Sequence, residues 1–527
     1  MIKRSALWAA PLLFVGVLFY WPLTNILQTG FTSEWIETFS EPSSLRAIWF
    51  TVWQALVSTL LCLVLGIPGA YLLYRKSFPG HKIIRALVTV PLVLPTIVVA
   101  IAFTSFRDLP AIWLIILAHI FINYSITVRT LGGVWATMDV ETEEAAAIAG
   151  AGRLRTLWSI SLPQLKPALV SAGALTFLFC ASSYGIVLVL GGGLVQSIET
   201  EISVAALQYL DLPKASALAI FQTLLTAMAF IVSDRITKGT VGIEQVDEGG
   251  NKPRVDKRDW LAVVVTGAII VGLIGWPIAQ VIAKSFSFDG VLSMQNFENL
   301  STRGERDLLN ITVLDAAVNS LRNAAIATVI SIVLGTLVAY LLSRPAVTKI
   351  AKLSNRTLDA LFLLPMGVSS VVLGFGYLVT FGGGPLPLRS SWLVVPLVQA
   401  LMALPLVIRL VYPALLSIGS EHREAAETEG ASAGQIWWQI EAPMIRGVLA
   451  TATGYAAVVS IGEFGAASLL AYGNQATLPT ILYSLISRPG AVNYGMAMAV
   501  CAILIALTLL LVFLVSVRGS NQTQRQP

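Results

Sequence analysis

Histidine and cysteine, the side chains most often used as metal ligands and nucleophiles, are rare in this 527-residue sequence. There are three of each, namely His81, His119, His422, Cys62, Cys180 and Cys501. The cysteines lie in separate apolar runs and the histidines are far apart, so neither has the close spacing of a zinc site or a disulfide framework. We therefore expect no metal site and no cysteine chemistry.

Two segments with identical spacing carry the clearest pattern in the chain. Residues 144–163 read EAAAIAGAGRLRTLWSISLP, and residues 424–443 read EAAETEGASAGQIWWQIEAP. The Ala-rich part favours a short helix, the Gly ends it, and the Pro stops a second short helix before the next apolar run. We expect a helix-turn-helix in each segment. Its apolar side, which needs a cover of lipid or partner protein, consists of Leu154, Leu157 and Trp158 in one copy and Ile436, Trp437 and Trp438 in the other.

The chain has no nucleotide-binding loop of the G-x-x-x-x-G-K-[ST] type. Its Gly-rich stretches, 191–193 and 382–384, lack the Lys and the Ser or Thr that hold phosphate and magnesium. We interpret them as turns. A process that uses ATP would therefore need a partner polypeptide.

Glu463 is the acidic residue that the sequence places deep in an apolar run, VVSIGEFGAASLL. A carboxylate in hydrocarbon costs at least about 2.5 kcal/mol, so it should face a partner group or a water-filled path. Two interpretations stay open: a residue of a translocation path, or a hydrogen-bonded structural acid near the outer interface.

Composition identifies the elements that hold these residues. Hydrophobic residues make up 56% of the chain and charged residues only 12%, whereas about a quarter of the residues of soluble domains are charged. Twelve apolar runs are long enough to span a bilayer. They lie near residues 5–27, 49–73, 84–105, 110–128, 166–190, 215–233, 260–284, 320–343, 357–380, 391–412, 447–471 and 496–517. We predict an all-α integral membrane protein with about twelve transmembrane helices.

The basic residues set the expected orientation. If the N-terminus is cytoplasmic, the inner segments hold 25 of the 34 Lys and Arg residues, as the positive-inside rule requires. We expect both termini in the cytoplasm of a bacterial cell, and the basic residues near a membrane make nucleic acid an unlikely partner. Arg129 and Arg409 end the fourth and tenth runs at this face, where they reach either lipid headgroups or a partner.

An offset of 280 residues relates the two halves of the chain. It superposes Glu144 on Glu424, Gly150 on Gly430, and Tyr184-Gly185 on Phe464-Gly465. Six runs per half is an even number, so the copies are parallel repeats about an axis along the membrane normal. We predict a first half at 1–233, a flexible cytoplasmic linker at 234–259, and a second half at 260–527.

Prolines and glycines interrupt the third run of each half. Pro91 and Pro95 lie in the first copy and Pro365 in the second, where Gly374 and Gly376 follow. We expect kinked helices that line a translocation path. Candidate path residues are Glu463, its mate Ser183 at the offset of 280, Pro95 and Pro365.

The paired loops resemble those of permease subunits of bacterial ABC importers. Fusion of two permease halves, together with LVLGGGLVQSIETEISVAAL from Leu188 and SIGEFGAASLLA from Ser460, is similar to the ferric-iron and thiamine importer permeases. The second copy departs from the usual Leu-Pro, with Ala442 before Pro443. By resemblance, the coupling residues are Glu144, Ala145, Ala146, Gly150, Ile160, Leu162, Pro163, Glu424, Ala425, Ala426, Gly430, Ile440 and Pro443.

The resemblance implies two copies of a separate ATPase that holds ATP and magnesium, a solute-binding protein outside the membrane, and alternating access. The chain itself would hold no cofactor and would not be an enzyme. Ferric iron is favoured as the solute, with thiamine a close second. A secondary active transporter of a small cation is the alternative, although it would need several buried acids. A polytopic enzyme would need clustered His, Asp or Glu at one membrane face.

Overall fold

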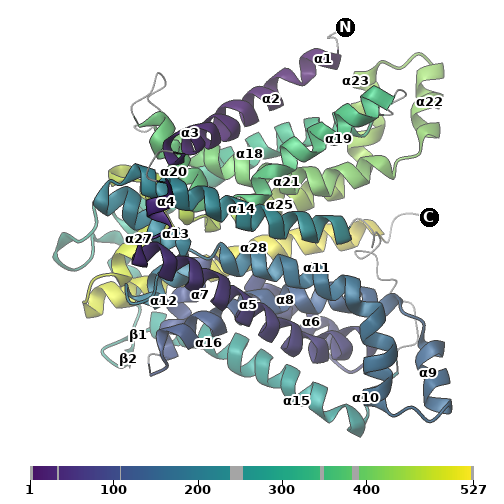
Figure 1. The fold of residues 1–527 in the computed structure, drawn as a ribbon, viewed down its shortest axis with the longest axis horizontal. Helices are drawn as coiled ribbons and strands as arrows, with labels where there is room; N and C mark the ends of the chain where they lie inside the picture. Colours follow the sequence, from purple (N-terminus) through teal and green to yellow (C-terminus); the bar gives the residue numbers. More distant parts are fainter. Residues whose placement is uncertain are drawn as a thin grey trace.

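The computed structural model describes residues 4–31, 35–106, 108–237, 253–344, 349–382 and 391–523. It is almost entirely helical (Figure 1). The helices of the first half are α1 (Arg4–Leu7), α2 (Ala9–Val15), α3 (Trp21–Gly30), α4 (Trp35–Thr38), α5 (Pro42–Ala70), α6 (His81–Val93), α7 (Thr96–Phe103), α8 (Ala111–Thr137), α9 (Val140–Ile148), α10 (Arg153–Thr156), α11 (Leu162–Ala181), α12 (Gly185–Gly191), α13 (Ile198–Val204) and α14 (Leu212–Thr237).

The second half repeats this order and adds one short hairpin. Its elements are α15 (Trp260–Ala268), α16 (Trp276–Ser285), β1 (Ser287–Phe288), β2 (Val291–Leu292), α17 (Gln295–Glu298), α18 (Val313–Leu342), α19 (Lys349–Leu363), α20 (Ser370–Phe381), α21 (Val394–Leu416), α22 (Ser420–Thr428), α23 (Ala433–Ile436), α24 (Ala442–Met444), α25 (Arg446–Gly462), α26 (Gly465–Leu470), α27 (Leu478–Ile486) and α28 (Ala491–Thr523). The strands β1 and β2 pair antiparallel.

Within the described residues, nine helices are long and apolar enough to cross a membrane, and there are twelve spans if each of three bent helix pairs counts as one. Every apolar run predicted above corresponds to one of these spans. The first bend, of 102°, lies between α6 and α7. The second, of 99°, separates Leu353–Gly367 from α20, and the third, of 74°, separates Ala433–Met444 from α25. The chain is therefore an all-α membrane protein.

The halves exchange their first spans. The hydroxyl of Tyr20, next to α3, donates a hydrogen bond to the carbonyl oxygen of Leu361 at 3.0 Å, and Asn25 donates to Thr380 at 3.0 Å. In the other direction, α15 of the second half packs against α5. Each half is thus incomplete alone, and the main core of buried side chains runs continuously through both.

Described structure extends into both ends of the predicted linker, residues 234–259. Asp234 belongs to α14, and the chain from Pro253 onward lies against the end of α5, where Asp259 pairs with Lys76 at 3.2 Å. Residues 238–252 lie outside the described residues. The boundaries of the three predicted segments remain predictions.

Candidate coupling loops and translocation path

The two repeated segments form helix-turn-helix loops at one end of the molecule. Figure 1 shows α9 and α10 at one corner of this end and α22 and α23 at the opposite corner. The first helix α1 starts at the same end, and α28 runs toward it, while α12, α13, α27 and the hairpin lie at the other. The paired loops therefore present two separate surfaces on one side of the membrane.

The turn in each loop depends on a glycine. Gly150 and Gly430 have φ values of +82° and +86°, in the left-handed region where a side chain is strained. Beyond them the N–H of Ala151 donates to the carbonyl of Ala146, and the N–H of Ala431 donates to that of Ala426, both at 2.9 Å. These bonds form the same helix-ending turn in both copies, so the predicted role of the glycine is confirmed.

The predicted role of the proline, to stop a second short helix before the next span, is wrong in the first copy and is met in the second. Pro163 lies in the first turn of α11, and the helix widens to a π-helical turn over Leu157–Ser161 and then continues into the fifth span. A proline has no N–H to donate to the preceding turn. The wider π-helical turn accommodates the missing hydrogen bond, so the helix continues through the proline. In the second copy the widened turn Trp437–Glu441 precedes Pro443, and the bend follows it at Ile445.

The sequence-predicted loop residues are mostly accessible. Ala145, Gly150, Pro163 and their mates Ala425, Gly430 and Pro443, with Glu424, are exposed, whereas Ala146, Ala426, Ile160, Ile440 and Leu162 are half-buried. Glu144 lies in α9, but its side chain is outside the described part. Of the apolar side chains, Leu154, Trp158 and Trp438 are at least 70% exposed, while Ile436 is buried against the protein. Exposed apolar rings on both loops fit surfaces that a partner covers.

The broken third span of each half begins its second helix in contact with the other half. Pro95 precedes α7, and Ser369 precedes the corresponding helix α20. Pro365 lies in the turn before α20, where Thr226 of the first half donates a hydrogen bond to the carbonyl of Gly367 at 2.6 Å. The predicted kinks are confirmed, and they lie where the two halves meet.

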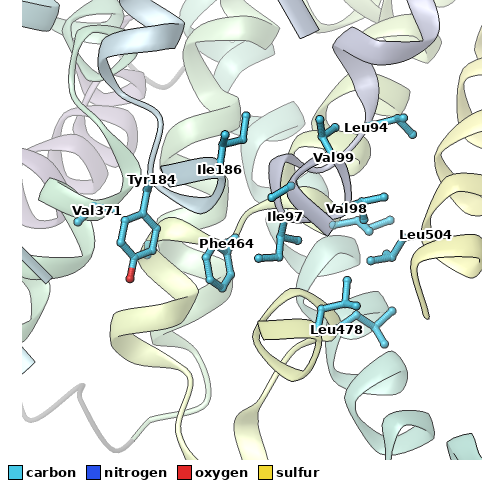
Figure 2. Close-up of a cluster of buried hydrophobic side chains, with 14 of the residues drawn as sticks. Leu94, Ile97, Val98, Val99, Tyr184, Ile186, Val371, Phe464, Leu478 and Leu504 are labelled. Atoms are coloured by element: carbon cyan, nitrogen blue, oxygen red, sulfur yellow. The ribbon is translucent and has the colours of Figure 1, made fainter. Parts of the chain in front are cut away.

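A second pair of breaks lies directly beside the first. The fifth span of each half ends before Tyr184 or Phe464, and the short helices α12 and α26 follow. These two rings are repeat mates, and they stack across the interface with centroids 5.5 Å apart and planes 24° apart (Figure 2). Pro95 lies against Gly462, since a Cβ on that glycine would be 3.3 Å from the proline ring.

The predicted path residues Ser183, Glu463 and Pro95 therefore meet at this interface. Both oxygens of Glu463 are occupied, since the backbone N–H groups of Ala466 and Ala467 donate to them at 2.7 and 3.0 Å. The carboxylate caps the start of α26. The structural interpretation of Glu463 thus has direct support, and a path role stays a prediction.

Sequence reasoning missed two further buried acids, Glu199 and Glu201, on α13. Both are at most 3% exposed, but Glu201 pairs with Lys214 at 3.0 Å. Glu199 accepts one hydrogen bond, from the side chain of Gln222 at 3.1 Å, and its Oε2 atom accepts no well-aligned bond from the described residues. Glu199 lies beside Ser369 and Glu463 beside Ser370, so both carboxyls lie at the start of α20.

The two arginines predicted to end the fourth and tenth spans differ. Arg129 is exposed, whereas Arg409 pairs with Asp234 of α14 in the first half and lies over the ring of Phe230. The second arginine therefore ties the halves together. His119 is fully buried, with its Nδ1 atom 3.4 Å from the hydroxyl of Ser58.

Comparison with known families identifies the class of protein. The pattern of the binding-protein-dependent transport system inner membrane components matches the chain twice, over residues 62–239 and 331–525. The chain belongs to this family. It is therefore a multi-pass inner-membrane permease of the ABC importer type with two fused domains, and the resemblance noted from the loops is confirmed.

Several curated relatives extend over both halves. The thiamine transport system permease protein ThiP of Brucella abortus is 27% identical over 472 residues, which cover 85% of this chain and 82% of the relative. The protein of the same name from Escherichia coli is 26% identical over 500 residues, or 89% and 90% of the two chains. A probable sulfate transport system permease protein, cysT of Nephroselmis olivacea, is 31% identical over 206 residues, or 36% and 72%. The preference for ferric iron has no support from these relatives.

Proposed function

We propose that this permease imports thiamine, and that separate ATPase subunits drive it. The observation that carries the proposal is the similarity to thiamine permeases across 85% or more of the chain, through both halves. Within the ABC importer class, thiamine therefore replaces ferric iron as the favoured solute.

Two copies of an ATPase would dock at the two loops, one at each. The loops repeat the same left-handed glycine and helix-ending turn, and both carry exposed tryptophans, which suits two identical partner surfaces. ATP and magnesium would bind to the partner, and this chain would perform no catalysis. Because the basic residues gather at the loop end, we assign that end and both termini to the cytoplasm. A solute-binding protein would then dock at the opposite end.

The solute would pass between the halves, where Tyr184 and Phe464 stack. Separation of these rings, as the halves rock apart, would open the interface. Thiamine is a flat organic cation, and aromatic faces and carboxylates are the groups that attract such a cation. Glu199, with an oxygen not used in a well-aligned bond, is the better placed of the two nearby acids to meet it.

The test is uptake of radiolabelled thiamine, ferric iron and sulfate by cells that lack their own thiamine permease and express this chain with its own ATPase and binding protein. We expect uptake of thiamine alone, abolished by a Walker A Lys→Ala substitution in the ATPase and insensitive to a protonophore while ATP is maintained. Uptake of iron or sulfate instead would refute the solute. Uptake that survives the ATPase substitution but stops with the protonophore would favour a secondary transporter.

A further inference from the structure

An ion pair between a buried arginine and a half-buried carboxylate ties the first loop to the inner end of the second span. Arg75, the last residue of the helix that continues α5, donates to Glu143 of α9 at 2.8 Å and to the carbonyl of Met138 at 2.8 Å. Ser161, at the start of the fifth span, donates to the other carboxylate oxygen of Glu143 at 3.1 Å. Arg75 is 8% exposed. Three segments of the chain thus meet at one carboxylate.

The second loop has the same connection with its charges exchanged. Here the carboxylate is Glu441, fully buried on the second helix of the loop, between Arg344 after α18 and Arg423 of α22, each at 2.6 Å. Arg423 also donates to the carbonyl of Leu415 at 2.8 Å, at the end of the preceding span.

The repeat offsets show that these are equivalent positions. The offset of 280 places Glu143 on Arg423 and Ser161 on Glu441. Arg75 and Arg344 are 269 residues apart, the separation at which Thr51 and Ser320 accept equivalent hydrogen bonds from Ile198 and Leu478 in the two halves. The carboxylate therefore lies on the first helix of one loop and on the second helix of the other. In the second loop, Arg423 occupies the position that Glu143 has in the first.

The same helix end also contacts the opposite half. Lys76, next to Arg75, pairs with Asp259 at 3.2 Å, and Tyr71 donates to Asp259 at 3.1 Å. Asp259 lies in the first turn of the seventh span. The first loop and a helix of the other half are therefore joined through two adjacent basic residues.

We propose that Arg75, Glu143 and Ser161, with Arg344, Arg423 and Glu441, are positioning residues that fix each loop to its span so that loop movement becomes movement of the halves. The inference deepens the proposed function and rests on it for its transport consequence. Each connection between loop and span requires one carboxylate that pairs with the basic residue of the span, and this carboxylate can lie on either helix of the loop.

The charge exchange between the halves provides a sharp test. Glu143→Arg removes the carboxylate and places a second guanidinium beside Arg75. Adding Ser161→Glu to it rebuilds in the first loop the arrangement of the second. With ATPase and binding protein present, we expect Glu143→Arg to reduce uptake by about tenfold or more, because an unpaired buried charge is costly, and the double variant to recover to within about threefold.

Hydrogen exchange of the loop amides, measured on the full chain in lipid nanodiscs without partners, tests the connection independently of transport. Glu143→Arg should accelerate exchange over residues 140–160, and the added Ser161→Glu should restore protection. Glu141→Arg is the matched control, since it makes the same charge change on an exposed residue of α9, and it should leave exchange unchanged.

Each outcome separates the two proposals. Failure of the double variant to restore protection would overturn the inference. Restored protection with wild-type uptake in Glu143→Arg would limit the pair to a structural role and refute positioning. If exchange behaves as expected but the wild-type complex shows no ATP-dependent uptake, the proposed function fails while the connection stands.

Discussion

The carboxyl group of Glu199 should make the stability of this protein depend on pH. It is fully buried on α13, outside every candidate span, and burial raises its pKa from 4.5 to about 8, although Ser369 and Gln222 partly offset this effect. At neutral pH it is therefore mostly protonated in this structure.

The sign and the size follow from linkage. A carboxyl whose pKa is higher in the folded state contributes stability that is fully present below pH 4.5 and is lost as the pH rises through 8. One pKa unit corresponds to about 1.4 kcal/mol, so the shift from 4.5 to about 8 sets an upper limit of about 5 kcal/mol.

Glu199→Gln keeps the shape of the side chain and cannot ionise. We expect the melting temperature of the purified wild type to fall between pH 5 and pH 9 and the variant to show a smaller fall, with the higher melting temperature at pH 9. The same variant should lose uptake of a cationic solute, because a cation near the carboxyl would favour its ionised form and glutamine cannot supply that charge.

Glu201→Gln is the matched control, two residues along the same helix. Glu201 already has a partner in Lys214 at 3.0 Å, and Lys214 would keep Glu41 at 2.7 Å. This variant should retain the wild-type pH slope. An unchanged slope in Glu199→Gln would refute the assignment of the titrating group, and a flattened slope with normal uptake would exclude Glu199 from the path.

Three further substitutions test the loops and the packing. Gly150→Ala should destabilise the loop by about 1–2 kcal/mol, because its φ is +82°, whereas Gly152→Ala, at an equally open position without positive φ, should not; hydrogen exchange of the loop distinguishes them. Gly374→Val would place a Cβ 2.8 Å from the Cα of Ala466, so thermal melting should show a loss of about 1–3 kcal/mol. Arg409→Ala removes an ion pair whose arginine is 34% exposed, so melting should change by less than about 1 kcal/mol.

The spans and loop turns could be predicted because their physical signals are local. A bilayer requires long apolar runs, and the left-handed turn at Gly150 and Gly430 requires a residue without a side chain. Both signals are visible in the residues themselves, and the repeat doubles them. The kinks at Pro95 and Pro365 were predictable for the same reason.

The burial of Glu199 on α13 could not be predicted in this way. The segment around Glu199 reads QSIETEIS, which looks like a polar outer loop, and the helix of seven residues is far too short for a span. Its burial comes from packing against α14 and α20, which the local sequence does not reveal. Likewise, nothing in the run ETEE at residues 141–144 distinguishes Glu143, which pairs with Arg75, from exposed Glu141.

The two halves share backbone conformation more closely than they share charged residues, and the difference in charged residues affects which solute the interface suits. Glycines with positive φ recur in both loops, but Glu463 has Ser183 as its mate and Glu199 has Pro479. Both carboxyls lie beside serines at the start of α20, and their mates at the offset of 280 are uncharged. Carboxyl groups are thus concentrated on one side of a pseudo-symmetric interface. A cation with its charge at one end would favour the ionised form of these carboxyls and be oriented by them, whereas an anionic solute would gain nothing from that arrangement.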